Sequence, residues 1–151
     1  MSKSKTVAIL FGGKSVEHKV SLRSAKNIYD NIDRKIYNVI LIGISQQGQW
    51  YHLKDFSFNI EEGEPIAVKL TQDKDIFFKW KDGRSLGDID IFFPVLHGND
   101  GEDGSIQGLF RTVNMPMVGT GVLGSAVVFD KICSKRLLTD AGIKNARFLS
   151  Y

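Results

Sequence analysis

Two glycine-rich segments of this sequence carry the side chains that could do chemistry. In residues 11–21, an apolar run ends at a pair of glycines, and Glu17 follows where a helix is expected to begin. In residues 94–104, a second apolar run ends at His97, and a loop with three glycines and three acids follows. A carboxylate that stays ionised at a helix start can bind an ammonium group. A titratable side chain at the carboxyl end of a buried strand lies where open α/β sheets bind ligands.

Each of these features also has a purely structural interpretation. Glu17 could complement the helix dipole or take part in capping with Ser15 or Ser21. The acids of the second loop could suggest a metal site, but their spacing does not fit the twelve-residue calcium loop. We therefore favour Glu102 and Asp103 as residues that cap the following helix. The glycine turn of the first segment matches neither the G-x-G-x-x-G fingerprint nor the P-loop pattern.

A third segment, residues 130–135, begins another predicted helix. Lys131 near its start could meet an anionic ligand, although most exposed lysines are simply solvated. Cys133 has no nearby histidine or acid pattern that would make it a nucleophile. It is the only cysteine, so no internal disulfide can form, which suits a reducing compartment. The sequence identifies no partner for His18 or His52.

Alternating strand and helix patterns surround these three segments. Continuous apolar runs predict strands buried on both faces of a sheet, and helical periodicity separates them. The predicted strands are residues 6–11, 37–44, 49–53, 89–96 and 117–119, with the opening of another at 147–151. The predicted helices are residues 17–32, 103–113, 122–129 and 130–141. Residues 54–87 alternate around 66–70 and 75–80, which predicts an antiparallel hairpin inserted between the β-α-β units.

This order of elements predicts an α/β fold, a three-layer Rossmann-like domain with a mostly parallel sheet. The 20 basic and 17 acidic side chains are well mixed, so the net charge of +3 does not indicate nucleic-acid binding. The polar amino terminus leads directly into a strand, and the apolar run there is too short for a signal peptide or a membrane span. We therefore expect a soluble, cytoplasmic protein without a membrane segment.

Together, the three segments resemble the signatures of one enzyme family. Residues 11–22 (FGGKSVEHKVSL) resemble the amino-terminal signature of D-alanine–D-alanine ligases. Residues 97–108 (HGNDGEDGSIQG) resemble their second signature, and residues 119–131 resemble the segment that leads into the next domain. Because the three matches occur in order, the resemblance covers nearly the whole chain.

The resemblance implies an ATP-grasp ligase that acts in peptidoglycan synthesis, with ATP and Mg²⁺ as cofactors. ATP would phosphorylate the carboxylate of one D-alanine, and the amine of a second D-alanine would attack the acyl phosphate. Glu17 would bind the ammonium group of the first D-alanine as a substrate-binding and catalytic residue, and His97 would interact with its carboxylate. The same pocket would be lined by Val20, Ser21 and Gly98. Lys131 would contact an ATP phosphate.

The resemblance also divides the chain in two. Residues 1–129 would form an amino-terminal substrate-binding domain of the pre-ATP-grasp type, and residues 130–151 would begin the central ATP-grasp domain. Complete ligases of this family are much longer, and their magnesium ligands, oxyanion-stabilising groups and catalytic serine lie in the part that this chain lacks. Ser150 is not that serine. We expect the 151-residue chain to be inactive alone and the full-length enzyme to be a homodimer.

Three alternatives stay open at this point. The chain could belong to a ligase that joins D-alanine to D-lactate or D-serine, because the residues that select the second substrate lie largely outside it. It could instead be a non-catalytic Rossmann-like domain that binds a ligand or a partner. A module that binds NAD or a flavin is a third possibility, against which the lack of G-x-G-x-x-G counts.

Overall fold

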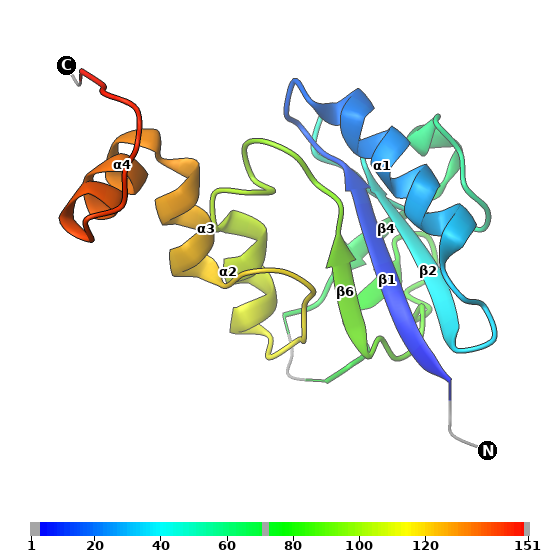
Figure 1. Ribbon diagram of the computed structural model, residues 1–151. Coiled ribbons are helices and arrows are strands. Elements are labelled where there is room, and N and C mark those ends of the chain that lie inside the picture. Colours follow the sequence, from blue (N-terminus) through cyan, green and yellow to red (C-terminus); the bar gives the residue numbers. More distant parts are fainter. Residues whose placement is uncertain (1–3, 71–72, 150–151) are drawn as a thin grey trace.

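The computed structural model describes residues 4–70 and 73–149 of the chain (Figure 1). Its elements in chain order are β1 (Lys5–Gly12), α1 (His18–Asn31), β2 (Tyr37–Ile44), β3 (Trp50–Leu53), the 3₁₀ turn Ile60–Glu62, β4 (Glu64–Val68), β5 (Phe77–Lys79), β6 (Ile91–Pro94), α2 (Ser105–Thr112), α3 (Val122–Phe129) and α4 (Lys131–Asp140). The predicted strands at residues 6–11 and 37–44 and the four predicted helices are confirmed, with small shifts at their ends.

The strands form one six-stranded sheet in the order β5-β4-β3-β2-β1-β6. β1 pairs in parallel with both β2 and β6, while β3, β4 and β5 continue the sheet beyond β2 as an antiparallel meander. Consequently β1, β2, β4 and β6 run in one direction and only β3 and β5 run in the other. The sheet is therefore mixed but mostly parallel in strand direction, as predicted, and the predicted insertion after β3 is the antiparallel part.

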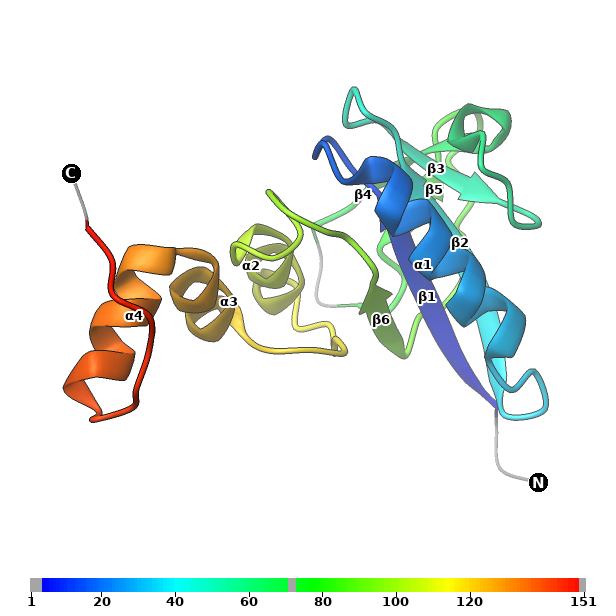
Figure 2. The same ribbon diagram turned by 45° about the horizontal axis from the view of Figure 1, so that its top comes forward.

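Helices cover both faces of the central strands, which gives three layers (Figures 1 and 2). On one face, Leu22 and Ala25 of α1 pack against Val7, Ile9 and Phe11 of β1. On the other face, the ring of Phe110 in α2 stacks on that of Phe92 in β6 with centroids 4.0 Å apart. Because successive side chains of a strand point to opposite faces, the continuous apolar sequence of β1 supplies both cores.

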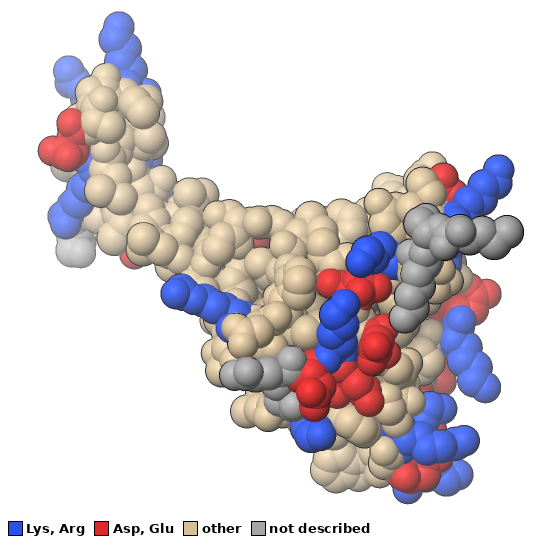
Figure 3. All heavy atoms as spheres, turned by 90° about the horizontal axis from the view of Figure 1, so that it is seen from below, with Lys and Arg blue, Asp and Glu red and all other residues tan. Residues whose placement is uncertain are grey.

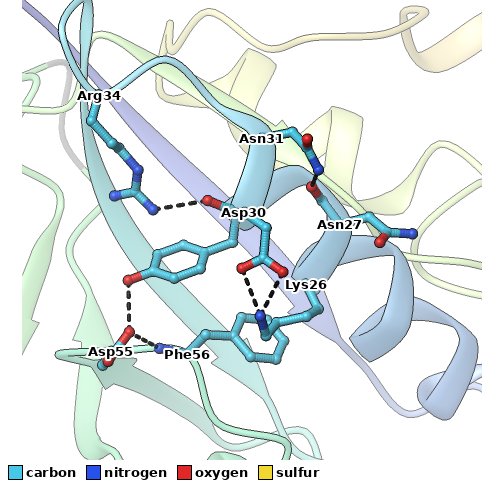
Figure 4. Close-up of polar contacts among 8 residues, drawn as sticks. Lys26, Asn27, Asp30, Asn31, Arg34, Asp55 and Phe56 are labelled. Carbon is cyan, nitrogen blue, oxygen red and sulfur yellow. Dashed lines mark hydrogen bonds and ion pairs between the residues drawn. The ribbon is translucent and has the colours of Figure 1, made fainter.

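The outward side of α1 is fixed to the loop after β3 by polar and aromatic contacts (Figure 4). The Tyr29 hydroxyl donates a 2.7 Å hydrogen bond to Asp55, and the Arg34 guanidinium lies 4.2 Å from the centre of the Tyr29 ring. The hydrogen bond raises the pKa of Tyr29 and lowers the pKa of Asp55. The ring of Phe56 stacks on Phe11 with centroids 5.2 Å apart, so this loop also covers the α1 core.

Three predicted strands differ from the structure. The strand expected at residues 89–96 is shorter, Ile91–Pro94, because only four residues of β1 pair with it before the chain turns away. At residues 117–119, only an isolated bridge from Met117 to Phe92 forms. Residues 147–149 form no strand, and Ser150 and Tyr151 lie outside the described residues. A strand needs a neighbouring strand, and α3 and α4 carry this end of the chain away from the sheet (Figure 1).

The helices α3 and α4 project from the body as an arm. In α3 only Ser125 is buried, and α4 has no buried residue. A largely uncharged surface joins this arm to the body, where acidic and basic side chains lie side by side (Figure 3). Large apolar side chains are exposed along the arm, including Leu123, Val128 and Leu137. In the described part of the chain, the helices are too short or too polar to cross a bilayer.

Asp90 ties the start of β6 to β1 and gives a prediction about acid stability. Its carboxylate accepts hydrogen bonds from Thr6 N (3.0 Å) and Lys74 Nζ (2.7 Å), with Lys5 Nζ 3.7 Å away. The bond from Lys74 and then that from Thr6 lower the pKa of Asp90 from 3.8 to about 2. Because the folded-state pKa is the lower one, the stabilisation is present above pH 3.8 and is lost as the pH falls toward about 2.

We expect Asp90→Asn to lower the free energy of unfolding by about 1 kcal/mol at neutral pH and to have less effect near pH 2. The expected loss is modest because the Asp90 side chain is 21% exposed and solvent screens its ion pairs. Urea unfolding at both pH values measures it, with the neighbouring exposed Asp88→Asn as the matched control. An equal deficit for Asp90→Asn at both pH values would contradict this account.

Candidate active site

The predicted site residues gather where the carboxyl ends of β1 and β6 lie side by side. After β1 the chain turns to α1 on one face of the sheet, and after β6 it passes through residues 95–104 to α2 on the other face (Figure 2). The loops of two adjacent parallel strands therefore diverge here, which creates a crevice at the edge of the sheet. Open α/β sheets bind their ligands at such a switch point.

The turn after β1 requires glycine because the backbone packs closely there. Gly12 has φ +90°, and a Cβ atom there would lie 2.3 Å from the carbonyl oxygen of Ile44 in the neighbouring strand. Gly13 N donates to the same oxygen at 2.7 Å. The ring of His18 folds back over this turn, with its Nδ1 2.7 Å from the carbonyl oxygen of Gly13. The turn is thus fixed in place before the helix begins.

Ser21 joins the two strand ends from beneath the loops. Its hydroxyl accepts a 2.7 Å hydrogen bond from Gly12 N and donates one of 2.5 Å to the carbonyl oxygen of Val95. The residue is fully buried. Both bonding directions of the hydroxyl are therefore used within the protein, and Ser21 presents no surface to a ligand. Its neighbour Val20 is 48% exposed.

Glu17 contacts the second loop rather than capping its helix. It occupies the position before α1, but its side chain makes no capping hydrogen bond; the Ser15 hydroxyl instead accepts from Glu17 N at 3.1 Å. A Cβ atom on Gly98 would lie 2.8 Å from Glu17 Oε2 and 2.5 Å from Ser15 Oγ. Gly98, with φ +71°, is thus the point where the two predicted segments touch.

His97 lies beside this contact, between a hydroxyl and a carboxylate. Its Nε2 is 3.2 Å from Ser24 Oγ on α1, and its Nδ1 is 3.7 Å from Glu102 Oε1. The other oxygen of Glu102 accepts a 2.9 Å hydrogen bond from Gly98 N. Glu102 therefore shapes the loop and lies near His97, and the prediction that it caps α2 is wrong. Ser24 was missed, because nothing in the sequence shows that α1 passes next to residue 97.

The remaining acids of the second loop also have structural roles. Asp103 accepts from Asp100 N and Ser105 N at 2.9 Å each, so it contacts the first residue of α2, although the N-cap itself is Gly104 and not Asp103 as predicted. Burial raises the pKa of Asp103, but these N–H groups outweigh it and hold the pKa below its ordinary value. Asp100 forms a 2.9 Å ion pair with Lys14 of the glycine turn, a second link between the loops. Within residues 4–70 and 73–149, no three His, Cys, Asp or Glu side chains are grouped to hold a metal ion.

Lys131 and the second loop line the same cavity. The cavity has a volume of about 590 Å³, and His97, Glu102, Ser125 and Lys131 are among the residues that line it. Lys131 Nζ donates a 3.1 Å hydrogen bond to the carbonyl oxygen of Val128. The structure thus brings Glu17, Gly98 and His97 together, and Lys131 shares with His97 the lining of this cavity.

Comparison with known proteins identifies the family of this chain. Residues 6–120 match the family model described as the D-ala D-ala ligase N-terminus. The chain is 43% identical to the D-alanine–D-alanine ligase of Proteus mirabilis, covering 95% of this chain and 42% of the relative. It is 46% identical to that of Oceanobacillus iheyensis, covering 97% of this chain and 43% of the relative.

Solved structures agree with these sequence relatives. The D-alanine–D-alanine ligase of Coxiella burnetii superimposes with a TM-score of 0.87 at 31% identity, over 94% of this chain and 42% of that one. The VanG D-Ala:D-Ser ligase of Enterococcus faecalis gives a TM-score of 0.83 at 36% identity, over 94% and 43%. The chain therefore spans less than half the length of these relatives. It belongs to the family of D-alanine–D-alanine ligase amino-terminal domains.

Proposed function

We propose that this chain is the part of an ATP-dependent D-alanine–D-alanine ligase that binds the first D-alanine. The observation that carries the proposal is the contact at Gly98, where the Glu17 carboxylate meets the loop that presents His97. Two segments about 80 residues apart in the sequence, each with its own family signature, converge there on one edge of the sheet.

The two side chains are complementary to an amino acid zwitterion. Glu17 is exposed, and its side chain makes no hydrogen bond that caps α1. Its carboxylate can therefore pair with the substrate ammonium group. His97 would donate a hydrogen bond to the substrate carboxylate from Nδ1, because Glu102 Oε1 is 3.7 Å from this atom, beyond hydrogen-bond distance, while Nε2 lies 3.2 Å from Ser24 Oγ. Val20 would contact the substrate methyl group. Ser21 acts as a positioning residue in this proposal, because its buried hydroxyl fixes both strand ends.

The described residues do not by themselves fit ATP or Mg²⁺. When bound, ATP would supply the phosphoryl group that activates the D-alanine carboxylate. In this chain, Lys131 is the cation proposed to meet a phosphate, while the carboxylate of Asp130 already binds Ile132 N and Cys133 N at 2.9 Å each. The N–H groups of Ile132 and Cys133 at the start of α4 are therefore already hydrogen-bonded. Within the described ranges, no cluster of three or more His, Cys, Asp or Glu side chains could hold a metal ion. We place the boundary between domains 1–129 and 130–151 at this cap.

The second substrate is proposed to be D-alanine, with D-serine and D-lactate as the alternatives. The similarity to D-alanine–D-alanine ligases supports D-alanine as the second substrate. The structural similarity to the VanG D-Ala:D-Ser ligase is the reason to retain D-serine as an alternative. We further propose a cytoplasmic homodimer, which sedimentation of the full-length protein would test.

One assay tests the proposed function. The full-length product of the gene is expected to release phosphate from ATP when D-alanine is supplied, and D-serine or D-lactate added with D-alanine should yield no mixed product. The 151-residue chain alone is expected to release none, because it spans only 42–43% of its relatives. Phosphate release by this chain that requires both ATP and D-alanine would refute the second expectation. A full-length product without ligase activity would refute the first.

A further inference from the structure

A second cavity lies at the switch point, on the opposite side of the His97 loop from the arm. It has a volume of about 380 Å³ and is enclosed by the glycine turn, the turn between β2 and β3, the second loop and the start of α2. Gly12, Gly13 and His97 contribute to its walls, but Glu17, Val20 and Lys131 do not. It therefore adjoins the proposed D-alanine site and shares His97 and the glycine turn with it, but Glu17 and Val20 lie outside its lining.

The floor of this cavity is apolar and well fixed. It is formed by Ile44, Trp50, Leu96, Ile106 and Leu109. Ile44, Leu96 and Ile106 belong to the buried core, and the Trp50 ring packs 5.7 Å from that of Phe77. A fixed apolar floor that includes an indole suits a flat aromatic ring, because aromatic contacts add to the burial of apolar area.

The mouth of the cavity is polar but carries balanced charge. The side chain of Lys14 crosses it: Lys14 Cδ lies 3.2 Å from where a Cβ of Gly48 would be, and Lys14 Nζ pairs with Asp100 at 2.9 Å. Gln47 and Asn99 also line the cavity and are exposed. Their amides can both donate and accept hydrogen bonds. A charged ligand would have to compete with the Lys14–Asp100 pair and lose water over an apolar floor.

We propose that this cavity binds a small neutral aromatic molecule of one or two fused rings that carries a hydrogen-bonding group on one edge. The volume lies near the lower end of the range for small-molecule pockets, roughly 300–1,000 Å³, so one ring system fits and a dinucleotide does not. The rings lie on the floor beside Trp50, and the polar edge points to the amides at the mouth. Because Gly12, Gly13 and His97 form part of the wall, the occupant contacts both loops of the proposed D-alanine site.

The two tryptophans of the chain provide the test. Trp50 lines the cavity, whereas Trp80, which follows β5, is 75% exposed and outside the cavity lining, so it serves as an internal control. Titration of the purified 151-residue chain with 2-naphthol, followed by the indole N–H signals in a ¹H–¹⁵N spectrum, should shift Trp50 saturably and leave Trp80 in place. The expected dissociation constant is of the order of 1 mM or tighter. The charged analogues 2-naphthoate and 2-naphthylmethylammonium should bind at least about tenfold more weakly.

A matched pair of variants locates the binding. Leu109→Phe places extra volume in the cavity and should weaken binding of 2-naphthol at least about tenfold. Leu137→Phe makes the same change on exposed α4 and should leave binding unchanged. Equal shifts of both indoles, no saturation, or undiminished binding by folded Leu109→Phe would overturn the proposal. If Leu109→Phe does not fold, equal affinity for the three naphthalene compounds would overturn it instead. None of these outcomes depends on ligase activity.

Discussion

The Gly12→Ala variant is expected to lose about 3 kcal/mol or more of its free energy of unfolding. A Cβ at residue 12 would lie 2.3 Å from the backbone oxygen of Ile44 and 2.6 Å from Ile60 Cδ1. The Ile60 side chain can rotate, but the oxygen belongs to β2, the parallel neighbour of β1, and it also accepts the hydrogen bond from Gly13 N. Relief of the clash therefore requires the strands to separate or the turn to move.

The chain offers a closely matched control for this prediction. Gly87 has φ +92°, almost the same as the +90° of Gly12, but a Cβ there would meet nothing within 4 Å. Gly87→Ala should therefore cost only the backbone strain, about 1–2 kcal/mol. Thermal unfolding followed by circular dichroism compares the two variants, with a drop of roughly 2–4 °C expected for each kcal/mol. If both variants lose the same stability, close strand packing is not what requires glycine at residue 12.

In the full-length enzyme, Glu17→Gln and His97→Gln are each expected to raise the requirement for D-alanine at the first site. A hydrogen bond to a charged group contributes about 1.5–3 kcal/mol, which corresponds to roughly a 10- to 150-fold weaker interaction. Glutamine keeps the size of the Glu17 side chain but removes its charge. Because the Glu17 carboxylate makes no capping hydrogen bond, the thermal stability of Glu17→Gln should stay close to that of the parent.

Steady-state kinetics over a wide range of D-alanine concentration measures these effects. Glu61→Gln is the matched control, since Glu61 is also an exposed glutamate at the start of a short helical turn and has no role in the proposed site. It should leave the D-alanine requirement unchanged. Unchanged kinetics in both Glu17→Gln and His97→Gln would remove the roles proposed for these residues, whereas the membership of the family would still rest on the sequence match.

The sequence by itself determined most of the secondary structure. The run at residues 37–44 became β2 without change, and the helix predicted at residues 122–129 became α3 without change. These segments were predictable because their periodicity is local: a strand buried on both faces needs a continuous apolar run, whatever its neighbours are. Glu17 and His97 were identifiable for the same reason, since each follows directly where such a strand gives way to a glycine loop.

The local sequence did not determine where the strands at the edges of the sheet begin and end. The apolar residues 89 and 95–96 are buried as a strand would be, but pairing with β1 covers only Ile91–Pro94. Residues 117–119 and 147–149 have strand-like composition, yet whether they pair depends on where the intervening helices take the chain. Burial of a side chain and hydrogen bonding of its backbone are separate conditions, and only the first is visible in the sequence.

Only the tertiary structure decided how the site is assembled. Ser24 lies beside His97, Lys14 pairs with Asp100, and Ser21 is buried under both loops. Each of these contacts joins residues more than 70 positions apart. The order of strands, with β6 beside β1, brings them together, and periodicity carries no information about that order. The sequence therefore predicted which residues could bind a zwitterion, and the pairing of β1 with β6 decided that these residues lie at one place.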